Sequence, residues 1–143
     1  MKQERIIKNR QMGSIKVDPS KVITFPEGVL GFEDIREYVI IDFEDHEPFQ
    51  WLVALDDPEV QFPIISPLLV KEDYSPSLAR ETVSQIGDFS DEDLLLYAIV
   101  TIRPGAIKVT ADLKGPIIIN QKTRLGKQII LDSDEYPLDH PVI

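Results

Sequence analysis

Apolar and polar residues alternate with a period of two along much of this chain, which is the pattern of half-buried β-strands. Segment 14–18, Ser-Ile-Lys-Val-Asp, alternates most cleanly. Other β-branched or aromatic runs are bounded by Pro, Gly or Asp, as strands commonly are. Segment 94–102 is apolar almost throughout, which predicts burial on both faces. We therefore expect strands at 14–18, 21–25, 37–42, 49–55, 94–102, 107–111, 116–120 and 128–131.

Helical patterns are scarce. Segments 32–37 and 77–84 are short helix candidates, and Ser77 is a candidate N-cap for the second. Ser90 is expected to cap a short turn before the long apolar strand. Gly126 predicts a hairpin turn over 123–126 with a positive φ, because glycine has no Cβ to oppose that conformation.

Many short strands, eleven dispersed prolines and only 143 residues predict a single-domain, all-β fold. We expect an antiparallel barrel or a barrel-like sandwich of short strands with one or two short helices. Residues 1–12 show no clean alternation and are expected to form a flexible N-terminal extension, with residues 13–143 as the β domain.

Composition and charge narrow the function. The chain has no cysteine, which excludes disulfides and Cys-ligated metals. Its longest apolar run holds nine residues, against about 20 for a membrane span, so we expect a cytoplasmic protein without membrane association. The net charge is −10, and segment 27–99 alone carries −15. Such a surface repels phosphate backbones and argues against direct nucleic-acid binding. It suits a basic protein partner, although acidic side chains also serve simply to keep a domain soluble.

The sequence contains no convincing catalytic or metal-binding pattern. His46 lies among carboxylates in segment 42–47 but lacks the second histidine typical of zinc sites, so a solvated loop explains it better. Segment 132–135 lacks the later glycine and glutamate of a calcium loop. No serine lies in a nucleophile elbow, and His140 is close to the chain end. We expect a non-enzymatic protein without metal or cofactor.

The most distinctive segment is 25–32, Phe-Pro-Glu-Gly-Val-Leu-Gly-Phe. Two glycines three residues apart, framed by aromatic residues and a proline, predict a strand that ends in a tight reversal. We expect the turn to return Phe25 and Phe32 to the core, with Gly31 at positive φ.

Several segments resemble the flagellar assembly factor W (FliW) family in order and spacing. Segment 23–32 resembles the family's opening motif. The acidic-Pro turn that ends 49–58 and the Pro-bounded segment 62–67 are similar to the next family segments. Segments 116–120 and 124–131 resemble its terminal hairpin. The resemblance extends from about residue 14 to residue 142, whereas family members usually begin just before strand 14–18.

The resemblance implies a bacterial, non-enzymatic protein that binds flagellin in the cytoplasm and sequesters the translational repressor CsrA, a small basic dimer. It would thereby couple flagellin synthesis to flagellum assembly. The alternative is a small non-catalytic structural or protein-interaction module with unrelated partners.

Two sets of residues are candidates for partner binding. The first is a polar hairpin whose cations are expected to contact a carboxylate on flagellin and whose amides are expected to pair with backbone: Asn120, Arg124, Lys127 and Gln128. A solvated turn covering a sheet edge is the alternative. The second set is chosen from charge clustering and is expected to face the basic regulator: Glu44, Asp45, Glu47, Asp56, Asp57 and Glu59.

Overall fold

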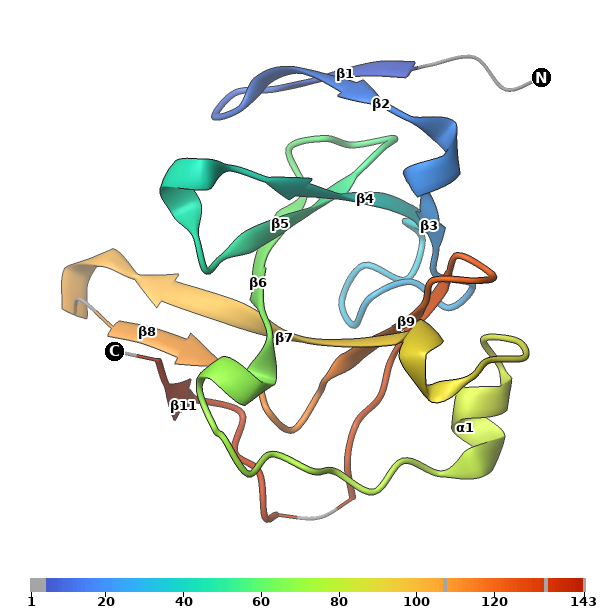
Figure 1. The fold of residues 1–143 in the computed structure, drawn as a ribbon. Helices are drawn as coiled ribbons and strands as arrows, with labels where there is room; N and C mark the ends of the chain where they lie inside the picture. Colours follow the sequence, from blue (N-terminus) through green and yellow to red (C-terminus); the bar gives the residue numbers. More distant parts are fainter. Residues whose placement is uncertain (1–4, 107, 133, 143) are drawn as a thin grey trace.

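The computed structural model describes residues 5–106, 108–132 and 134–142 and consists mainly of strands (Figure 1). The strands are β1 (Arg5–Asn9), β2 (Gly13–Val17), β3 (Ile23–Thr24), β4 (Glu37–Asp42), β5 (Gln50–Ala54), β6 (Gln61–Ile65), β7 (Leu94–Arg103), β8 (Lys108–Ala111), β9 (Ile117–Asn120), β10 (Leu125–Gln128) and β11 (His140–Pro141). The helical elements are α1 (Arg80–Ser84) and the 3-10 turns η1 (Pro19–Lys21), η2 (Glu44–His46), η3 (Pro67–Leu69), η4 (Asp91–Asp93) and η5 (Pro104–Ala106).

A closed barrel forms the centre of the molecule (Figure 1). Its wall is made of β3, β4, β5, β6, β7, β9 and β10, and it closes because β7 pairs with both β6 and β9. Neighbouring strands are antiparallel except β3 and β10, which are parallel. The predicted all-β barrel is therefore confirmed, with one parallel pair.

Side chains alternate between the barrel interior and its outer surface, and both sides are apolar. The interior is filled by residues such as Phe25, Tyr38, Leu52 and Ile119. Outward-facing Ile118 belongs to a second core, which α1 and the C-terminal segment cover. Because covering layers bury the outer face of several strands, those strands are more continuously apolar than simple alternation predicts.

The N-terminal hairpin differs from the expected flexible extension. Strand β1 pairs with β2 along its whole length. Ile7 and Val17 are nearly fully buried, and they pack with Val39 and Val53 on the outer face of β4 and β5. Residues 5–12 are thus part of a layer that covers the barrel.

The alternation of β1 is obscured in the sequence, because one of its inward-facing residues, Asn9, is polar and one of its outward-facing residues, Ile6, is apolar. Ile7 and Asn9 are buried, while the intervening Lys8 is exposed and Ile6 is 65% exposed. Residues 1–4, which belong to the same predicted extension, lie outside the described residues.

Several strand boundaries agree with the prediction, and others do not. Strand β4 coincides with segment 37–42, and β2 is displaced by one residue from segment 14–18. Strands β3, β5 and β9 are shorter than predicted, whereas β7 is one residue longer. The start of segment 107–111 lies outside the described residues. Strand β6 was not predicted, because Pro63 interrupts it and proline cannot donate to a ladder. Segment 128–131 is wrong as a strand, since β10 ends where that segment begins.

Gly126 does not occupy the predicted turn. It lies within β10, and the residue with positive φ in this hairpin is Arg124, at 60°. A Cβ on Gly126 would lie 2.7 Å from Cζ of Phe25, so the glycine is required because an aromatic ring packs against its backbone. The requirement is steric and comes from a residue about a hundred positions earlier in the chain.

The remaining local predictions have mixed outcomes. Segment 32–37 is not helical, and α1 begins after Ala79 without a cap from Ser77. Ser90 does cap η4, with a reciprocal capping box to Asp93. Strand β7 is buried on both faces only near its middle, because Thr101 and the residues after it are exposed.

Candidate functional site

Asn120 lies at the end of β9 and is fully buried. Its Nδ2 donates to the carbonyl oxygens of Ile86 and Asp88 at 3.0 and 3.1 Å. Its Oδ1 accepts from the backbone amides of Lys122 and Thr123. Asn120 therefore holds the β9–β10 turn to the segment after α1, and a direct contact with a partner would require this turn to open.

Arg124, the last residue of that turn, is held in the left-handed region by its backbone contacts. Its amide donates to the carbonyl of Asn120, and its carbonyl accepts from Thr24. One guanidinium nitrogen donates to the Lys21 carbonyl at 2.7 Å, whereas Nε is buried without a hydrogen-bond partner in the described part of the chain. The side chain lines a shallow pocket of about 690 Å³ together with residues of η1, β3 and β4.

Lys127 and Gln128 attach β10 to the glycine-containing turn at 25–33. Lys127 forms an ion pair with Glu27. Gln128 uses both ends of its amide, since Oε1 accepts from the Leu30 amide at 2.9 Å and Nε2 donates to the Gly115 carbonyl at 3.0 Å. These two residues therefore position the turn, and their expected contact with flagellin stays a prediction.

The turn itself has the predicted geometry. Gly28 and Gly31 have φ values of 69° and 88°, which side chains with a Cβ rarely adopt. Phe25 is fully buried and packs edge-on against Tyr38, with ring centroids 5.3 Å apart. Phe32 returns toward the core only partly, because it is 38% exposed while its ring packs on Phe62.

An exposed apolar surface results from this arrangement. Leu30 lies between the two glycines and is 67% exposed, and Ile130, just beyond β10, is 51% exposed. Both line a small pocket of about 160 Å³, together with Glu27, Glu33 and Gln128. A leucine displayed on a rigid turn beside carboxylates is suited to contact another protein.

The six acidic candidates do not form one patch, because they lie at opposite ends of β5. Glu44, Asp45 and Glu47 are in the β4–β5 turn, around η2, and all three are exposed. No ion pair involves them within the described residues. This turn is a local concentration of uncompensated negative charge.

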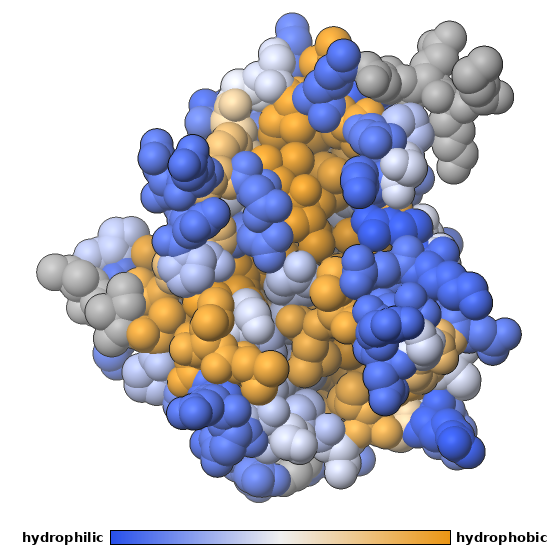
Figure 2. Space-filling model, in the orientation of Figure 1, coloured by the Kyte–Doolittle hydropathy of each residue, from blue (hydrophilic) through white to orange (hydrophobic). Residues whose placement is uncertain are grey.

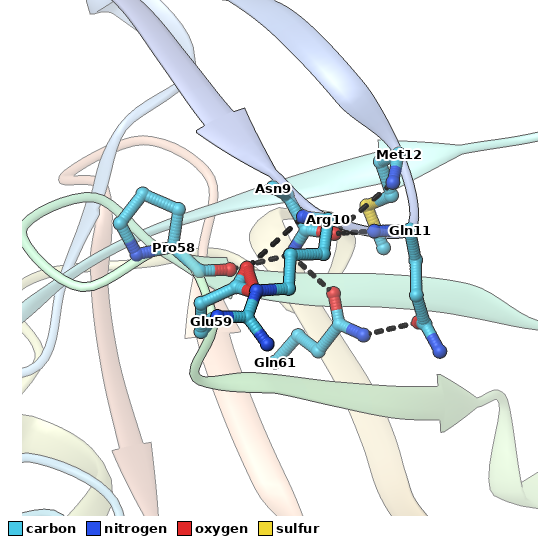
Figure 3. Close-up of polar contacts among 7 residues, drawn as sticks. All are labelled: Asn9, Arg10, Gln11, Met12, Pro58, Glu59 and Gln61. Atoms are coloured by element: carbon cyan, nitrogen blue, oxygen red, sulfur yellow. Dashed lines mark hydrogen bonds and ion pairs between the residues drawn. The ribbon is translucent and has the colours of Figure 1, made fainter.

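The other three acidic candidates lie in the β5–β6 loop, where the N-terminal hairpin neutralises two of them. Figure 3 shows one of these contacts, that of Arg10 with Glu59. Arg5 forms an ion pair with Asp56 at 3.0 Å, and Arg10 forms one with Glu59 at 3.4 Å. Asp57 is exposed and accepts a turn hydrogen bond through its backbone carbonyl. Charge counting along the sequence missed this neutralisation, because the arginines are about fifty residues away.

Asn9 fixes the hairpin over this loop (Figure 3). Its Nδ2 lies within hydrogen-bond distance of the Pro58 carbonyl and of Gln61 Oε1, at 2.5 and 2.6 Å. Its Oδ1 accepts from the amides of Gln11 and Met12, at 2.8 and 3.0 Å. A nearly fully buried asparagine thus connects β1, its own turn and the β5–β6 loop.

Titratable groups with shifted pKa values are dispersed through the fold. Burial raises the pKa of Tyr38 to about 12. Burial also raises the pKa of the Asp112 carboxyl, against the opposing effect of hydrogen bonds from the Gly115 and Lys114 amides.

Among the described residues, no group of three or more acidic or histidine side chains is placed to hold a metal ion. His46 instead accepts a hydrogen bond from Trp51 Nε1 at 3.0 Å.

Apolar surface is also visible away from the turn at 25–33. In Figure 2, hydrophilic side chains divide it into separate areas, one of which lies between the N-terminal hairpin and the barrel. A groove of about 690 Å³ beside α1 is lined by Leu78, Val83, Phe89 and Leu94. Across the described residues, no helix is long and apolar enough to cross a membrane.

Comparison with known proteins agrees with the fold. The family model described as "FliW protein" matches residues 5–142. A flagellar assembly factor FliW from Thermoanaerobacter pseudethanolicus is 41% identical over 138 residues, covering 96% of this chain and 92% of that protein. One from Thermotoga petrophila is 37% identical over 131 residues, covering 91% and 88%.

A crystal structure of the flagellar assembly factor FliW superposes with a TM-score of 0.87 at 30% identity, and the match covers 97% of both chains. The match to the family model includes β1 and β2, so the N-terminal hairpin is within the family's span. The barrel, its covering hairpin and these matches together show that the chain belongs to the FliW family of flagellar assembly factors.

Proposed function

We propose that this protein binds flagellin in the cytoplasm and sequesters the translational regulator CsrA, coupling flagellin synthesis to flagellum assembly. Membership of a family of flagellar assembly factors carries the proposal, because assembly factors act through protein partners. The exposed features of the chain, an acidic turn and an apolar turn, are of the kind that protein partners contact.

The β4–β5 turn is the better candidate for a basic regulator. Glu44, Asp45 and Glu47 have no neutralising cation among the described residues, whereas Arg5 and Arg10 already compensate Asp56 and Glu59. Only uncompensated charges produce a field that extends to a partner. A negative turn docked beside a basic RNA-binding surface also repels phosphates, so it can release RNA without covering the RNA site.

The turn at 25–33 is the better candidate for flagellin. Leu30 and Ile130 are exposed there, while Lys127 and Gln128 have internal partners that hold the turn in place. Lys127 and Gln128 therefore contribute to flagellin binding by fixing the position of Leu30, and not by donating hydrogen bonds to flagellin themselves. Burial of an aliphatic anchor of this kind stabilises a complex by about 1.5–3 kcal/mol.

Calorimetry with monomeric flagellin tests the first interaction. We expect about one-to-one binding with an affinity typical of a specific interface. Leu30→Ser should weaken binding at least about tenfold, since an exposed anchor is lost without a change to the buried core. Leu68→Ser is the control, because Leu68 is also exposed but lies on η3, outside the turn at 25–33. Heats equal to dilution for the folded wild-type protein would refute flagellin binding.

Two charge variants test the second interaction. We expect Glu44→Gln, Asp45→Asn and Glu47→Gln together to weaken CsrA binding or RNA displacement, because they remove uncompensated charge. The matched variant Asp56→Asn, Asp57→Asn and Glu59→Gln removes the same formal charge and should have a smaller effect, because these carboxylates lie at the other end of β5 from the turn proposed to face CsrA.

RNA displacement from CsrA is measured by fluorescence anisotropy at about 50 and about 300 mM salt, where the screening length falls from about 14 to about 6 Å. Wild-type displacement should weaken at high salt more steeply than complex formation does. Equal behaviour of both variants and the wild-type protein at both salts would show that the charges only confer solubility.

A further inference from the structure

The end of β7 leaves the barrel and carries an open strand edge. Its ladder with β6 contains only Ile64↔Ile99 and Ile65↔Ala98, whereas its ladder with β8 continues to Arg103. In Figure 1 the β7–β8 ribbon extends beyond β6 on the left of the view. Pro63, the next residue of β6, has no amide to donate to a neighbouring strand, which explains why the two strands separate there.

Backbone direction identifies the groups at this edge. The carbonyl of Ile99 accepts from the amide of Asp112, so it points toward β8. Because successive residues of a strand direct their backbone groups to opposite sides, Thr101 and Arg103 also point toward β8. The amide and carbonyl of Ile102 therefore point away from β8, and no described strand pairs with them.

The exposed fractions of its side chains show that the end of the β7–β8 ribbon lies outside the core. Val100 is 3% exposed, while Ile102, next on the same face, is 53% exposed. Strand β11 pairs with β8 on the other side of this ribbon, at Ala111 and Thr110, so the unpaired edge beside Ile102 belongs to β7. An added strand there would complete the backbone pairing of β7 and cover the exposed side chain of Ile102.

The charge at the ribbon end selects the partner. Arg103 lies directly opposite Lys108, and neither forms an ion pair within the described residues. Like charges opposite one another on two strands are unfavourable. A second copy of this chain would add its own two cations at the same place, so charge disfavours edge-to-edge pairing of two copies.

We infer that the open edge of β7 is a docking site for an extended, acidic segment of a partner protein, which adds as a strand beside Ile102 and places a carboxylate near Arg103. The amide and carbonyl of Ile102 supply the backbone hydrogen bonds, and the cations supply the charge preference. This site is separate from the acidic and apolar turns assigned above and does not depend on the identity of their partners.

The test uses the full-length, isotope-labelled protein and a blocked synthetic peptide, Thr-Val-Glu-Val-Glu-Val-Thr, with the glutamates replaced by lysines in a control peptide. Amide resonances in two-dimensional NMR should shift at Val100, Ile102 and Arg103 with the acidic peptide, and not with the basic one. Ile102→Pro removes the edge donor without removing an amide that faces β8, and should weaken binding at least about tenfold. Ile102→Val retains the amide and is the matched control.

Three results would overturn the inference. Absence of shifts with the acidic peptide would show that the edge does not accept a strand. Equal binding of both peptides would remove the role of charge. Sedimentation showing a wild-type dimer that Ile102→Pro dissociates would identify a second copy of the chain as the occupant.

Discussion

Replacing Gly126 with alanine should destabilise the barrel where the turn at 25–33 joins it. The new methyl group would lie 2.7–3.0 Å from three carbons of the Phe25 ring, where ordinary contacts are 3.4–4 Å. The ring has little room to move, because Phe25 is fully buried and packs edge-on against the equally buried Tyr38. The backbone of β10 or the turn must therefore shift.

Overpacking of a rigid core by one methyl group costs about 1–3 kcal/mol. For a chain of this length, that corresponds to a fall in melting temperature of about 3–9 °C. Thermal unfolding followed by circular dichroism measures it. Gly105→Ala is the control, because a Cβ there would meet nothing within 4 Å.

A double-mutant cycle isolates the proposed contact. In a Phe25→Leu background, which leaves space above Gly126, Gly126→Ala should cost less than it does alone. A melting curve of Gly126→Ala that matches the wild-type curve would show that Phe25 can move freely. Equal costs of Gly126→Ala in the two backgrounds would show that the destabilisation has another source.

Three further predictions concern single residues. Gly31→Val should lower stability by about 1–3 kcal/mol through backbone strain, since its φ is 88° and a Cβ there would meet nothing within 4 Å; an unchanged melting temperature would contradict this. Asn120→Ala removes a fully buried amide with four backbone partners and should cost about 2–4 kcal/mol in urea unfolding, and a loss below 1 kcal/mol would show that water replaces it. Burial raises the pKa of Asp112 above its ordinary value of 3.8, so this group opposes folding increasingly as the pH rises through the raised pKa and has no such effect below 3.8. Asp112→Asn should therefore raise the melting temperature at pH 7 and leave it unchanged near pH 3, and a gain equal at both pH values would exclude charge burial as its cause.

Local patterns in the sequence were sufficient for features that depend on neighbouring residues. Strand β4 begins and ends where alternation and its flanking residues predicted. Ser90 caps η4, because a serine and an aspartate three residues apart can satisfy each other's backbone amides. Gly31 has the predicted positive φ, since a tight reversal between aromatic residues requires one.

The candidate binding residues were only partly predictable, because their environment comes from distant segments. Asn120 was selected for its polarity, yet it is buried against the segment after α1. The acidic set was selected as one cluster, yet β5 separates it into two, and Arg5 neutralises Asp56. Residues that are close in sequence lie at opposite ends of the barrel when a whole strand separates them, as β5 separates the two acidic groups.

Tertiary structure alone decided the closure of the barrel and the roles of its most constrained residues. The pairing of β3 with β10 joins strands about a hundred residues apart, and the pairing of β7 with β9 passes over β8, and no local pattern encodes such partners. Strand β1 is ordered because the outer face of β4 and β5 needs an apolar cover. Gly126 is a glycine because of the Phe25 ring. Alternation and turn chemistry are local properties that a sequence displays directly, whereas steric fit, burial and charge neutralisation depend on contacts that exist only once the chain has folded.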